Sequence, residues 1–245
     1  MGLVFKGLHP VFPRRASEAT ARQGVERSPY YWWFEYLKRN DNYRDCCLNG
    51  GSGPLANLYA DWGVVLNDTS FKAWWYERGY RLFAEKRASI ELQELASPSQ
   101  WDPSWTNEEV MVVAVPLSLG KRYIQGFLAG LLKKRHTGKR GRQKKDDRSP
   151  SNARYPLHRI TVINTLRRQL EIYDAVMAVK RGEDKRTLAK IGADMKLVKT
   201  AMPNSRDRPK EAADKRAVMA ATVSRHFRQA KQNIEGTARG IFPLV

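Results

Sequence analysis

The stretch Ser28–Asn40, "SPYYWWFEYLKRN", predicts the helix around which the fold is built. Ser28 is a preferred helix N-cap residue, and Pro29 suits the first helical position because the N–H that it lacks would be unpaired there anyway. Aromatic side chains surround most of this cylinder instead of one face of it. A helix of this kind lies between neighbours. We therefore expect a helix to about Arg39 that is embedded in an aromatic core.

Two more aromatic segments follow, "PLANLYADW" at 54–62 and "SFKAWWYERGYRLFAEK" at 70–86, the second with Ser70 as a cap. All seven tryptophans lie within residues 1–105. Such rings could form a base-stacking platform, but they recur at helical spacing without interleaved Lys or Arg, which favours core packing. We predict an aromatic helical domain at 28–105, preceded by a flexible N-terminal arm at 1–27.

The charge of the chain is divided unequally along its 245 residues. Residues 1–105 contain 13 Lys and Arg against 12 Asp and Glu, whereas residues 106–245 contain 31 against 13, so the second part carries +18 of the net +19. Nucleic acid and anionic lipid are the partners that compensate so much positive charge. The adjacent Cys46 and Cys47 have no metal-ligand spacing, and no apolar run approaches the ~20 residues of a membrane span. We expect a soluble, cytoplasmic protein without a cofactor, metal or membrane partner.

Residues 106–182 are predicted to form a strand, a helix, a basic loop and a long helix. "VMVVAVP", Val110–Pro116, is typical of a short buried strand, with "LVFKGL" near the N-terminus or "WGVVL" at 62–66 as candidate partners. "LGKRYIQGFLAGLLKKRH" predicts a helix with four apolar side chains turned inward: Ile124, Phe127, Leu128 and Leu131. In 158–182, an apolar stripe predicts a core helix that ends at Gly182 and faces the aromatic domain or a partner subunit.

Residues 133–145 contain eight Lys and Arg, two glycines and no acid, which predicts a mobile basic loop. The run exceeds what favourable helix-terminal charge requires, so we interpret it as a contact for nucleic acid. A solvated linker and a membrane patch are the alternatives, and the second is disfavoured because the run lacks bulky apolar residues and an amphipathic anchor. The candidate contacts are Lys133, Lys134, Arg135, Lys139, Arg140, Arg142, Lys144 and Lys145.

Residues 183–245 predict a basic module of two packed helices. "DKRTLAKIGADMKLV" predicts the first, and "KEAADKRAVMAATVSRHFRQAKQNIEG" the second, with an apolar stripe at Met219, Val223, Phe227, Ala230 and Ile234. Arginine and glutamine are side chains that read base edges, so the candidate DNA contacts here are Arg216, Arg225, Arg228, Gln229 and Lys231. About fifteen residues separate the helices instead of the 3–4 of a standard turn. Either a short helix fills this gap, or the module is a helical bundle with a basic exterior.

Three stretches carry a resemblance to known families. "WWFEYLKRNDNYRDCC" resembles the W-E-[FY]-L-[RK]-R-N-x-x-Y-R motif of small regulator-like proteins carried on bacterial integrative and conjugative elements. "TLAKIGADMKL" and "VSRHFRQAKQNIEGTARGIFP" resemble the helix-turn-helix modules of bacterial regulators and invertases. The resemblance implies a DNA-binding regulator of a mobile genetic element.

Catalytic patterns are few. The four histidines, His9, His136, His158 and His226, are widely separated and form no metal-ligand or base-nucleophile pattern. Asp174 followed by Glu183-Asp184-Lys185 is similar to the D…E-x-K set of magnesium-dependent nucleases, but here E-x-K follows the end of a helix instead of lying on a strand. We therefore expect no enzymatic activity and keep a Mg²⁺-dependent nuclease as an alternative.

The sequence as a whole predicts a mainly α protein with an aromatic-rich helical N-terminal domain, a short buried strand element and a basic helix-turn-helix-like C-terminal region. Its expected partner is DNA, with RNA left open, and the aromatic domain is a candidate surface for a homodimer or for protein partners. The main alternative is a non-catalytic subunit of a nucleoprotein effector, CRISPR-like or transpositional. A regulator should prefer its operator over random duplex by at least ~10³, whereas such a subunit should bind any strand about equally.

Overall fold

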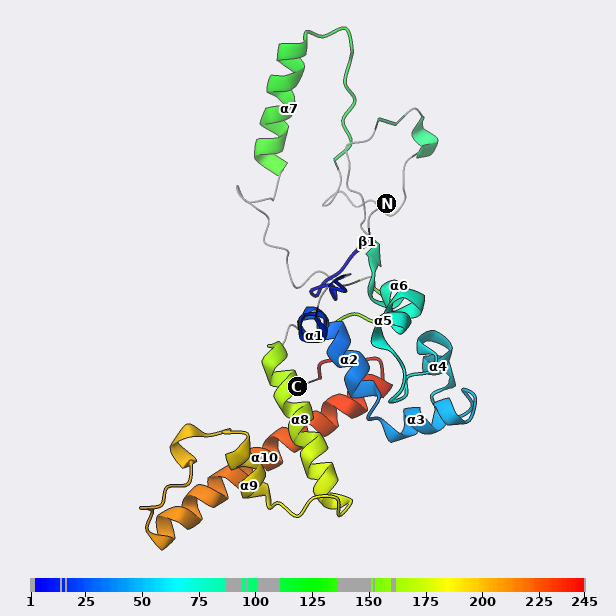
Figure 1. Ribbon diagram of the computed structural model, residues 1–245. Helices are drawn as coiled ribbons and strands as arrows, with labels where there is room; N and C mark the ends of the chain where they lie inside the picture. Colours follow the sequence, from blue (N-terminus) through cyan, green and yellow to red (C-terminus); the bar gives the residue numbers. More distant parts are fainter. Residues whose placement is uncertain are drawn as a thin grey trace. The chain divides into compact units, whose positions relative to one another are not determined.

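The computed structural model is mainly helical, as predicted, and describes residues 3–13, 15, 17–86, 94–95, 97–100, 111–135, 151, 153–159 and 162–244 (Figure 1). The chain forms two compact units. The first combines Met1–Arg87 with Ser151–Val245, and the second is Ala88–Pro150. These units divide the chain differently from the predicted segments, because the aromatic N-terminal helices and the basic C-terminal helices belong to one unit.

The N-terminal part of the first unit is a series of short helices closed by a two-stranded antiparallel ribbon. The strands are β1 (Leu3–Val4) and β2 (Glu85–Lys86), with Leu3 opposite Lys86. The helices between them are α1 (Glu18–Glu26), α2 (Pro29–Leu37), α3 (Asp41–Leu48), α4 (Ala56–Trp62), α5 (Phe71–Trp74), a π-helical turn (Trp75–Gly79) and α6 (Tyr80–Phe83).

Helix α2 confirms the prediction from its sequence. It begins at Pro29, and the Ser28 hydroxyl accepts a hydrogen bond from the Tyr30 N–H at 3.3 Å. Its side chains are buried around most of the cylinder, since Tyr30, Trp32, Trp33, Phe34, Tyr36 and Leu37 are all at most 6% exposed. The helix ends at Leu37, two residues before the expected Arg39.

The core around α2 includes residues from the far end of the chain. The Phe242 ring lies 5.5 Å from the Trp33 ring and 5.1 Å from the Tyr36 ring, between centroids. The Tyr36 hydroxyl donates to the Leu166 carbonyl at 2.9 Å. These contacts join segments more than a hundred residues apart, so neither half completes the hydrophobic core alone.

Two described parts of the first 27 residues, which the sequence predicted to form a flexible arm, contact the aromatic helices. Ser17 caps α1, and the Trp32 indole N–H donates to the Glu26 carbonyl at the end of that helix, at 2.7 Å. Nearer the N-terminus, the Phe5 ring lies 5.8 Å from the Trp75 ring. Aromatic side chains of α2 and of the π-helical turn thus contact both of these parts.

The second unit contains a 3₁₀ turn (Pro98–Gln100) and helix α7 (Lys121–Arg135). The predicted strand is not formed over 111–116, the part of it that the structure describes, and these residues have no sheet partner among the described residues. The stretch "LVFKGL" does contain a strand, β1, but it pairs with β2. The expected strand is therefore not confirmed, since an apolar, β-branched composition favours an extended backbone but does not supply a neighbouring strand.

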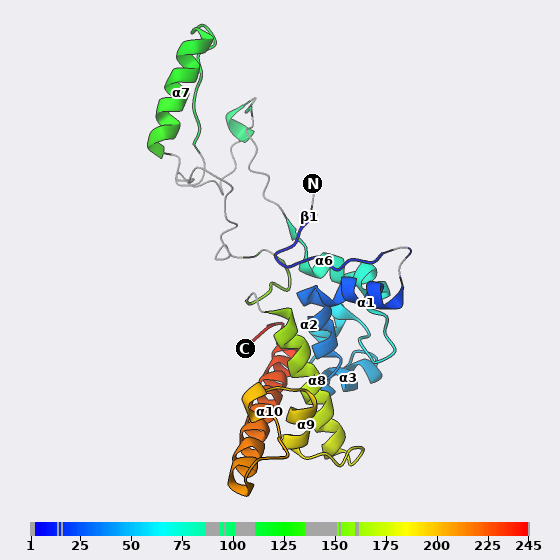
Figure 2. The same ribbon diagram turned by 60° about the vertical axis from the view of Figure 1, so that its left-hand side comes forward.

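The C-terminal part of the first unit contains α8 (Ile163–Lys180), α9 (Leu188–Asp194), a 3₁₀ turn (Lys199–Ala201) and α10 (Pro209–Ala238) (Figure 2). Helix α8 ends just before Gly182, which has φ +78°. Helix α9 packs closely against α10 at Gly192. A Cβ atom at this glycine would lie only 3.2 Å from the Met219 Cβ. Within the described ranges, no helix combines the length and apolarity needed to cross a bilayer.

We predict that Phe242→Ala lowers the free energy of unfolding by about 3–5 kcal/mol, because it removes a fully buried ring from between α2 and the C-terminal helices. Urea unfolding followed by tryptophan fluorescence measures this change. Phe127→Ala is the matched control, since Phe127 is 56% exposed and its truncation should alter stability little. Equal stability of the two variants would show that the C-terminal segment is not part of the aromatic core.

Candidate nucleic-acid interface

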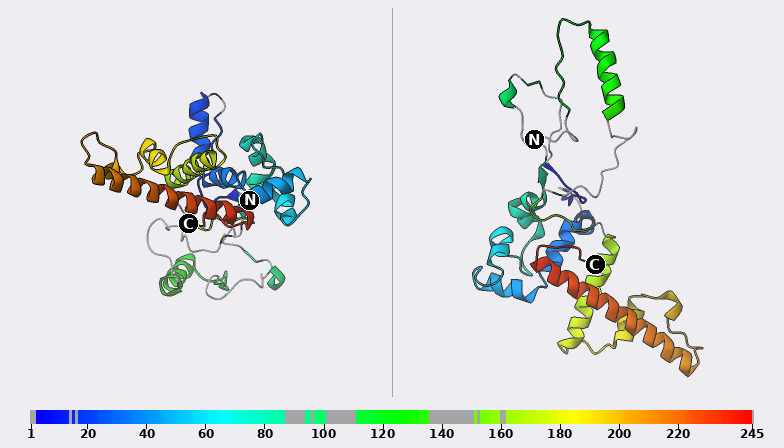
Figure 3. Two further views of the ribbon diagram at one scale, coloured as in Figure 1. Left: turned by 90° about the horizontal axis from the view of Figure 1, so that it is seen from below. Right: turned by 180° about the vertical axis from the view of Figure 1, so that it is seen from behind.

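Helix α10 provides the framework for most of the candidate DNA contacts. Its predicted apolar stripe faces α8 and α9, with Met219, Val223, Ala230 and Ile234 buried and Phe227 half-buried. The Phe227 ring stacks on Tyr173 of α8 at 5.4 Å, and the Lys180 ammonium lies 4.5 Å from its centroid. This packing fixes the rotation of α10 and therefore the side that faces solvent. Figure 3 shows the long helix α10 from two further directions.

Arg225 and Arg228 lie on the solvent side of α10 and are exposed. Neither has a carboxylate within ion-pair distance among the residues that the structure describes. Lys231 is exposed one turn further along, with its ammonium 3.9 Å from Glu235. Arg216 is exposed too, but it precedes Arg225 by nine residues and is therefore roughly half a turn away around the axis. The candidate cations of α10 thus belong to two faces.

Gln229, which the sequence predicted to read bases, makes a contact inside the protein. Its side-chain oxygen accepts a hydrogen bond from the Gln169 amide of α8 at 3.1 Å. The Gln169 oxygen lies 3.3 Å from the Asn233 amide, which donates to it, and Asn233 accepts from the Leu244 N–H at 2.8 Å. Gln229 therefore belongs to a polar network between α8 and α10. The sequence pattern of α10 alone does not reveal this polar partner on another helix, and base reading by Gln229 stays a prediction.

Arg168 of α8 is a further exposed cation at this surface, and the sequence analysis did not select it. Its charge acts on His226 of α10, whose pKa is lowered by burial first and by Arg225 and Arg168 next. The His226 Nδ1 is buried without a hydrogen-bond partner among the described residues. Positive charge from two helices thus converges near His226, and a bound anion would relieve the repulsion.

The first turns of α10 add more exposed cations. No residue from Pro209 to Val218 is buried, and Lys215 of this stretch binds Asp207 and Glu211. Three exposed cations at or just before the helix start have no ion pair among the described residues: Arg206, Arg208 and Lys210. The sequence did not indicate these residues as DNA contacts. They are exposed because α9 does not cover the beginning of α10, which only the structure shows.

The basic run after residue 132 is described only at its start. Lys133, Lys134 and Arg135 form the exposed last turn of α7, in the second unit. The remaining candidates of this run, Lys139, Arg140, Arg142, Lys144 and Lys145, lie outside the described residues. Their predicted contact with nucleic acid stays a prediction.

Many other cations of the C-terminal part are paired with carboxylates. Arg154 binds Asp61 at 2.7 Å, Arg167 binds Glu26 at 2.7 Å, and Arg186 lies between Asp184 and Asp194. Carboxylates of the protein therefore neutralise some of the exposed cations and not others. This pairing leaves Arg168, Arg225 and Arg228 as the exposed, unneutralised cations where the described parts of α8 and α10 adjoin.

The carboxylates of the nuclease-like pattern also bind arginines. Asp174 accepts two hydrogen bonds from the Arg39 guanidinium, both at 2.7 Å, and Glu183 accepts from Arg181 at 2.7 Å. Among the residues that the structure describes, no three His, Cys, Asp or Glu side chains gather as they would around a metal ion. The described geometry therefore lends no support to the magnesium-binding pattern.

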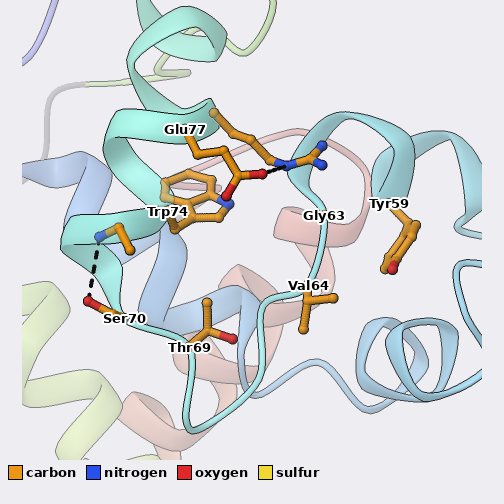
Figure 4. Close-up of a pocket in the computed structure, with 9 residues that line it drawn as sticks. Tyr59, Gly63, Val64, Thr69, Ser70, Trp74 and Glu77 are labelled. Carbon is orange, nitrogen blue, oxygen red and sulfur yellow. Dashed lines mark hydrogen bonds and ion pairs between the residues drawn. The ribbon is translucent and has the colours of Figure 1, made fainter.

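The aromatic rings of the first unit do not form a base-stacking surface where they are described. A hollow of about 300 Å³ beside α4 and α5 reaches Trp74 (Figure 4), yet Trp74 is only 3% exposed and stacks on Trp62 at 5.0 Å. Arg78 at its rim is engaged, because its guanidinium donates to the Ala60 carbonyl at 3.0 Å and pairs with Glu77. Core packing is confirmed for the described tryptophans.

We expect Arg225→Gln to raise the pKa of His226 towards the ordinary value of about 6.5, because one of the two repelling cations is removed. In the native chain the pKa of His226 is lower in the folded state than in the unfolded state. The neutral imidazole therefore contributes to stability at higher pH, and the free energy of unfolding falls as the pH drops through about 6.5. Titration of the imidazole signals by NMR measures the shift. The control is Lys210→Gln, which removes a charge elsewhere on α10 and should leave the pKa of His226 unchanged. If both variants gave the same titration curve, Arg225 would not act on His226 as the structure indicates.

We predict that Asp174→Ala destabilises the fold by about 1–3 kcal/mol, since Arg39 loses a bidentate charged partner while remaining largely buried. Glu183→Ala, which breaks an exposed pair, should change thermal stability little. Parallel melting curves, with Mg²⁺-dependent cleavage of DNA as a second readout, distinguish this structural role from a catalytic one. Cleavage that disappears in both variants would restore the nuclease alternative.

No protein-family model, curated protein or solved structure matches this chain. The geometry of the α8–α10 surface is therefore the basis on which a function can be argued.

Proposed function

We propose that this protein binds DNA through the solvent face of α10 and the adjoining part of α8. The observation that carries the proposal is the group formed by Arg168, Arg225 and Arg228, which are exposed and have no ion pair in the described part of the chain. Several other exposed arginines of the same unit are held by carboxylates, among them Arg154, Arg181 and Arg186. A surface left positive in this way suits a regular array of phosphates.

The proposed mechanism is electrostatic binding by a rigid element. Arginine donates two parallel hydrogen bonds to a phosphate and displaces condensed counterions from the DNA, which gives affinity without sequence information. The Gln169 to Gln229 hydrogen bond and the packing of Met219 hold α10 against α8 and α9, so the guanidiniums project from a fixed frame. Little ordering of the backbone then opposes binding.

Sequence readout is the finer part of the proposal. Arg225 and Arg228 can also bind guanine edges if α10 enters a major groove, whereas Gln229 is engaged within the protein. The long connection between α9 and α10, which contains the 3₁₀ turn Lys199–Ala201, replaces the short turn of a standard helix-turn-helix. We therefore assign α9 the role of supporting α10.

The biological role that we propose is regulation on a bacterial mobile genetic element, in the cytoplasm. Support for it comes from the "WWFEYLKRN" resemblance and from the basic C-terminal part of the chain. In this proposal, the basic run from Lys133 to Lys145 adds sequence-independent phosphate contacts. Equal affinity for any single or double strand would instead favour the alternative of a subunit in a nucleoprotein assembly.

The expected result for the double variant Arg225→Gln with Arg228→Gln is weaker DNA binding and a flatter dependence of log K on log salt. The slope should fall by roughly 0.9 for each phosphate that the variant no longer neutralises. Fluorescence anisotropy with a labelled duplex, repeated over a salt series, measures both quantities.

The matched control is Arg181→Gln with Arg186→Gln, which removes the same charge from arginines that already bind Glu183, Asp184 and Asp194. It should leave the salt slope close to that of the native chain. If both double variants flatten the slope equally, net charge alone drives binding and the α8–α10 surface has no special role.

A further inference from the structure

The described part of the second unit exposes an unusual amount of apolar surface. From Met111 to Arg135, 14 of 25 residues are apolar, and not one of these 25 is buried. Leu117 is 91% exposed, Tyr123 64%, Phe127 56% and Leu132 47%. Contiguous exposed apolar surface marks a site of interaction, because isolated folding does not favour it.

The extended residues and the helix together form this surface. Residues 113–116 and Leu119 line a shallow groove with Tyr123, Ile124, Phe127 and Leu128 of α7. The extended stretch runs alongside the helix (Figure 2). Even the side chains of α7 that turn towards this stretch, such as Ile124 and Leu128, are only half-buried. The apolar surface therefore continues across both segments.

Positive charge flanks this apolar surface at both ends of α7. Lys121 and Arg122 occupy the first turn, and Lys133, Lys134 and Arg135 the last. Cations in a first turn oppose the helix macrodipole, so helix stability does not explain Lys121 and Arg122. Moreover, residues 110–145 contain ten Lys and Arg and no acid at all. The partner of this surface must therefore be both anionic and apolar.

The positive charge of this segment distinguishes between the partners that could cover its apolar surface. A second copy of this chain would bring the same cations into contact with themselves, which is unfavourable. Nucleic acid would satisfy the cations but would leave Phe127, Tyr123 and Leu132 in water. An anionic bilayer surface satisfies both, because a helix lying in the interface buries its apolar side about 5–10 Å deep while lysine and arginine reach the headgroups.

We infer that residues 111–135 dock on the surface of a bilayer that contains anionic lipids, with α7 lying in the plane of the interface. The helix is about 22 Å long at 1.5 Å per residue, so it lies on the bilayer instead of crossing it. Membrane binding was disfavoured from sequence because the basic run lacked an amphipathic anchor, and α7 with its extended neighbour supplies one. This inference is independent of the DNA-binding surface on α8 and α10.

Flotation of the full chain with vesicles tests the inference. The chain should float with vesicles of phosphatidylcholine mixed with phosphatidylglycerol and should remain unbound with phosphatidylcholine alone. The variant Phe127→Ser with Leu132→Ser should bind the mixed vesicles about tenfold more weakly or worse, because apolar area no longer enters the interface. Both side chains are largely exposed, so folding should be preserved.

Val218→Ser is the control, because Val218 of α10 is 47% exposed, the same fraction as Leu132, but lies outside this surface. It should bind vesicles like the native chain. The apolar double variant should also retain the native affinity for DNA, whereas Arg225→Gln with Arg228→Gln should retain vesicle binding, so the two proposals fail or hold separately.

Three results would overturn the inference. The first is an absence of binding to the mixed vesicles at low salt. The second is unchanged vesicle binding in the apolar double variant, which would indicate adsorption by net charge alone. The third is a native oligomer that the apolar double variant dissociates, as seen by light scattering, since the surface would then be an interface between copies of this chain.

Discussion

Burial of α2 on nearly all sides is the constraint on which the first unit depends. A helix with rings around its whole circumference needs neighbours in every direction, and the segments close to it in sequence cover only part of it. Phe242, Leu166 and Leu170 complete the enclosure from the C-terminal part of the chain. The consequence is a single core in which residues separated by more than a hundred positions hold the same rings in place.

Polar contacts then fix the helices that the aromatic core brings together. Tyr36 reaches the Leu166 carbonyl, the Asn40 side chain donates to the Ile234 carbonyl at 3.0 Å, and Gln169 connects α8 to Gln229 and Asn233. Buried polar groups are costly when unpaired, so these bonds specify one rotation of α10 against α8. That rotation decides which cations face solvent, and it links the aromatic core to the charged surface.

The α8–α10 surface and the α7 surface arise from the fold in different ways. On α8 and α10, carboxylates neutralise most neighbouring arginines and leave Arg168, Arg225 and Arg228 exposed on a packed support. On α7, apolar and basic side chains share a helix in which no residue is fully buried. The first surface is suited to phosphates held at a fixed spacing, and the second to an environment that is apolar and anionic at once.

Local chemistry alone determined helices α2 and α7 to α10, the caps at Ser28 and Ser70, the stop before Gly182 and the apolar stripe of α10. Capping and periodicity act within a few residues, so the sequence shows them directly. It also determined that positive charge gathers after residue 105. Tertiary structure alone decided that Gln229 binds Gln169, that Arg39 holds Asp174, and that Arg168 and Arg225 both lie near His226. Pairing, neutralisation and exposure depend on groups far away in sequence, and only the packing around α2 brings those groups within reach.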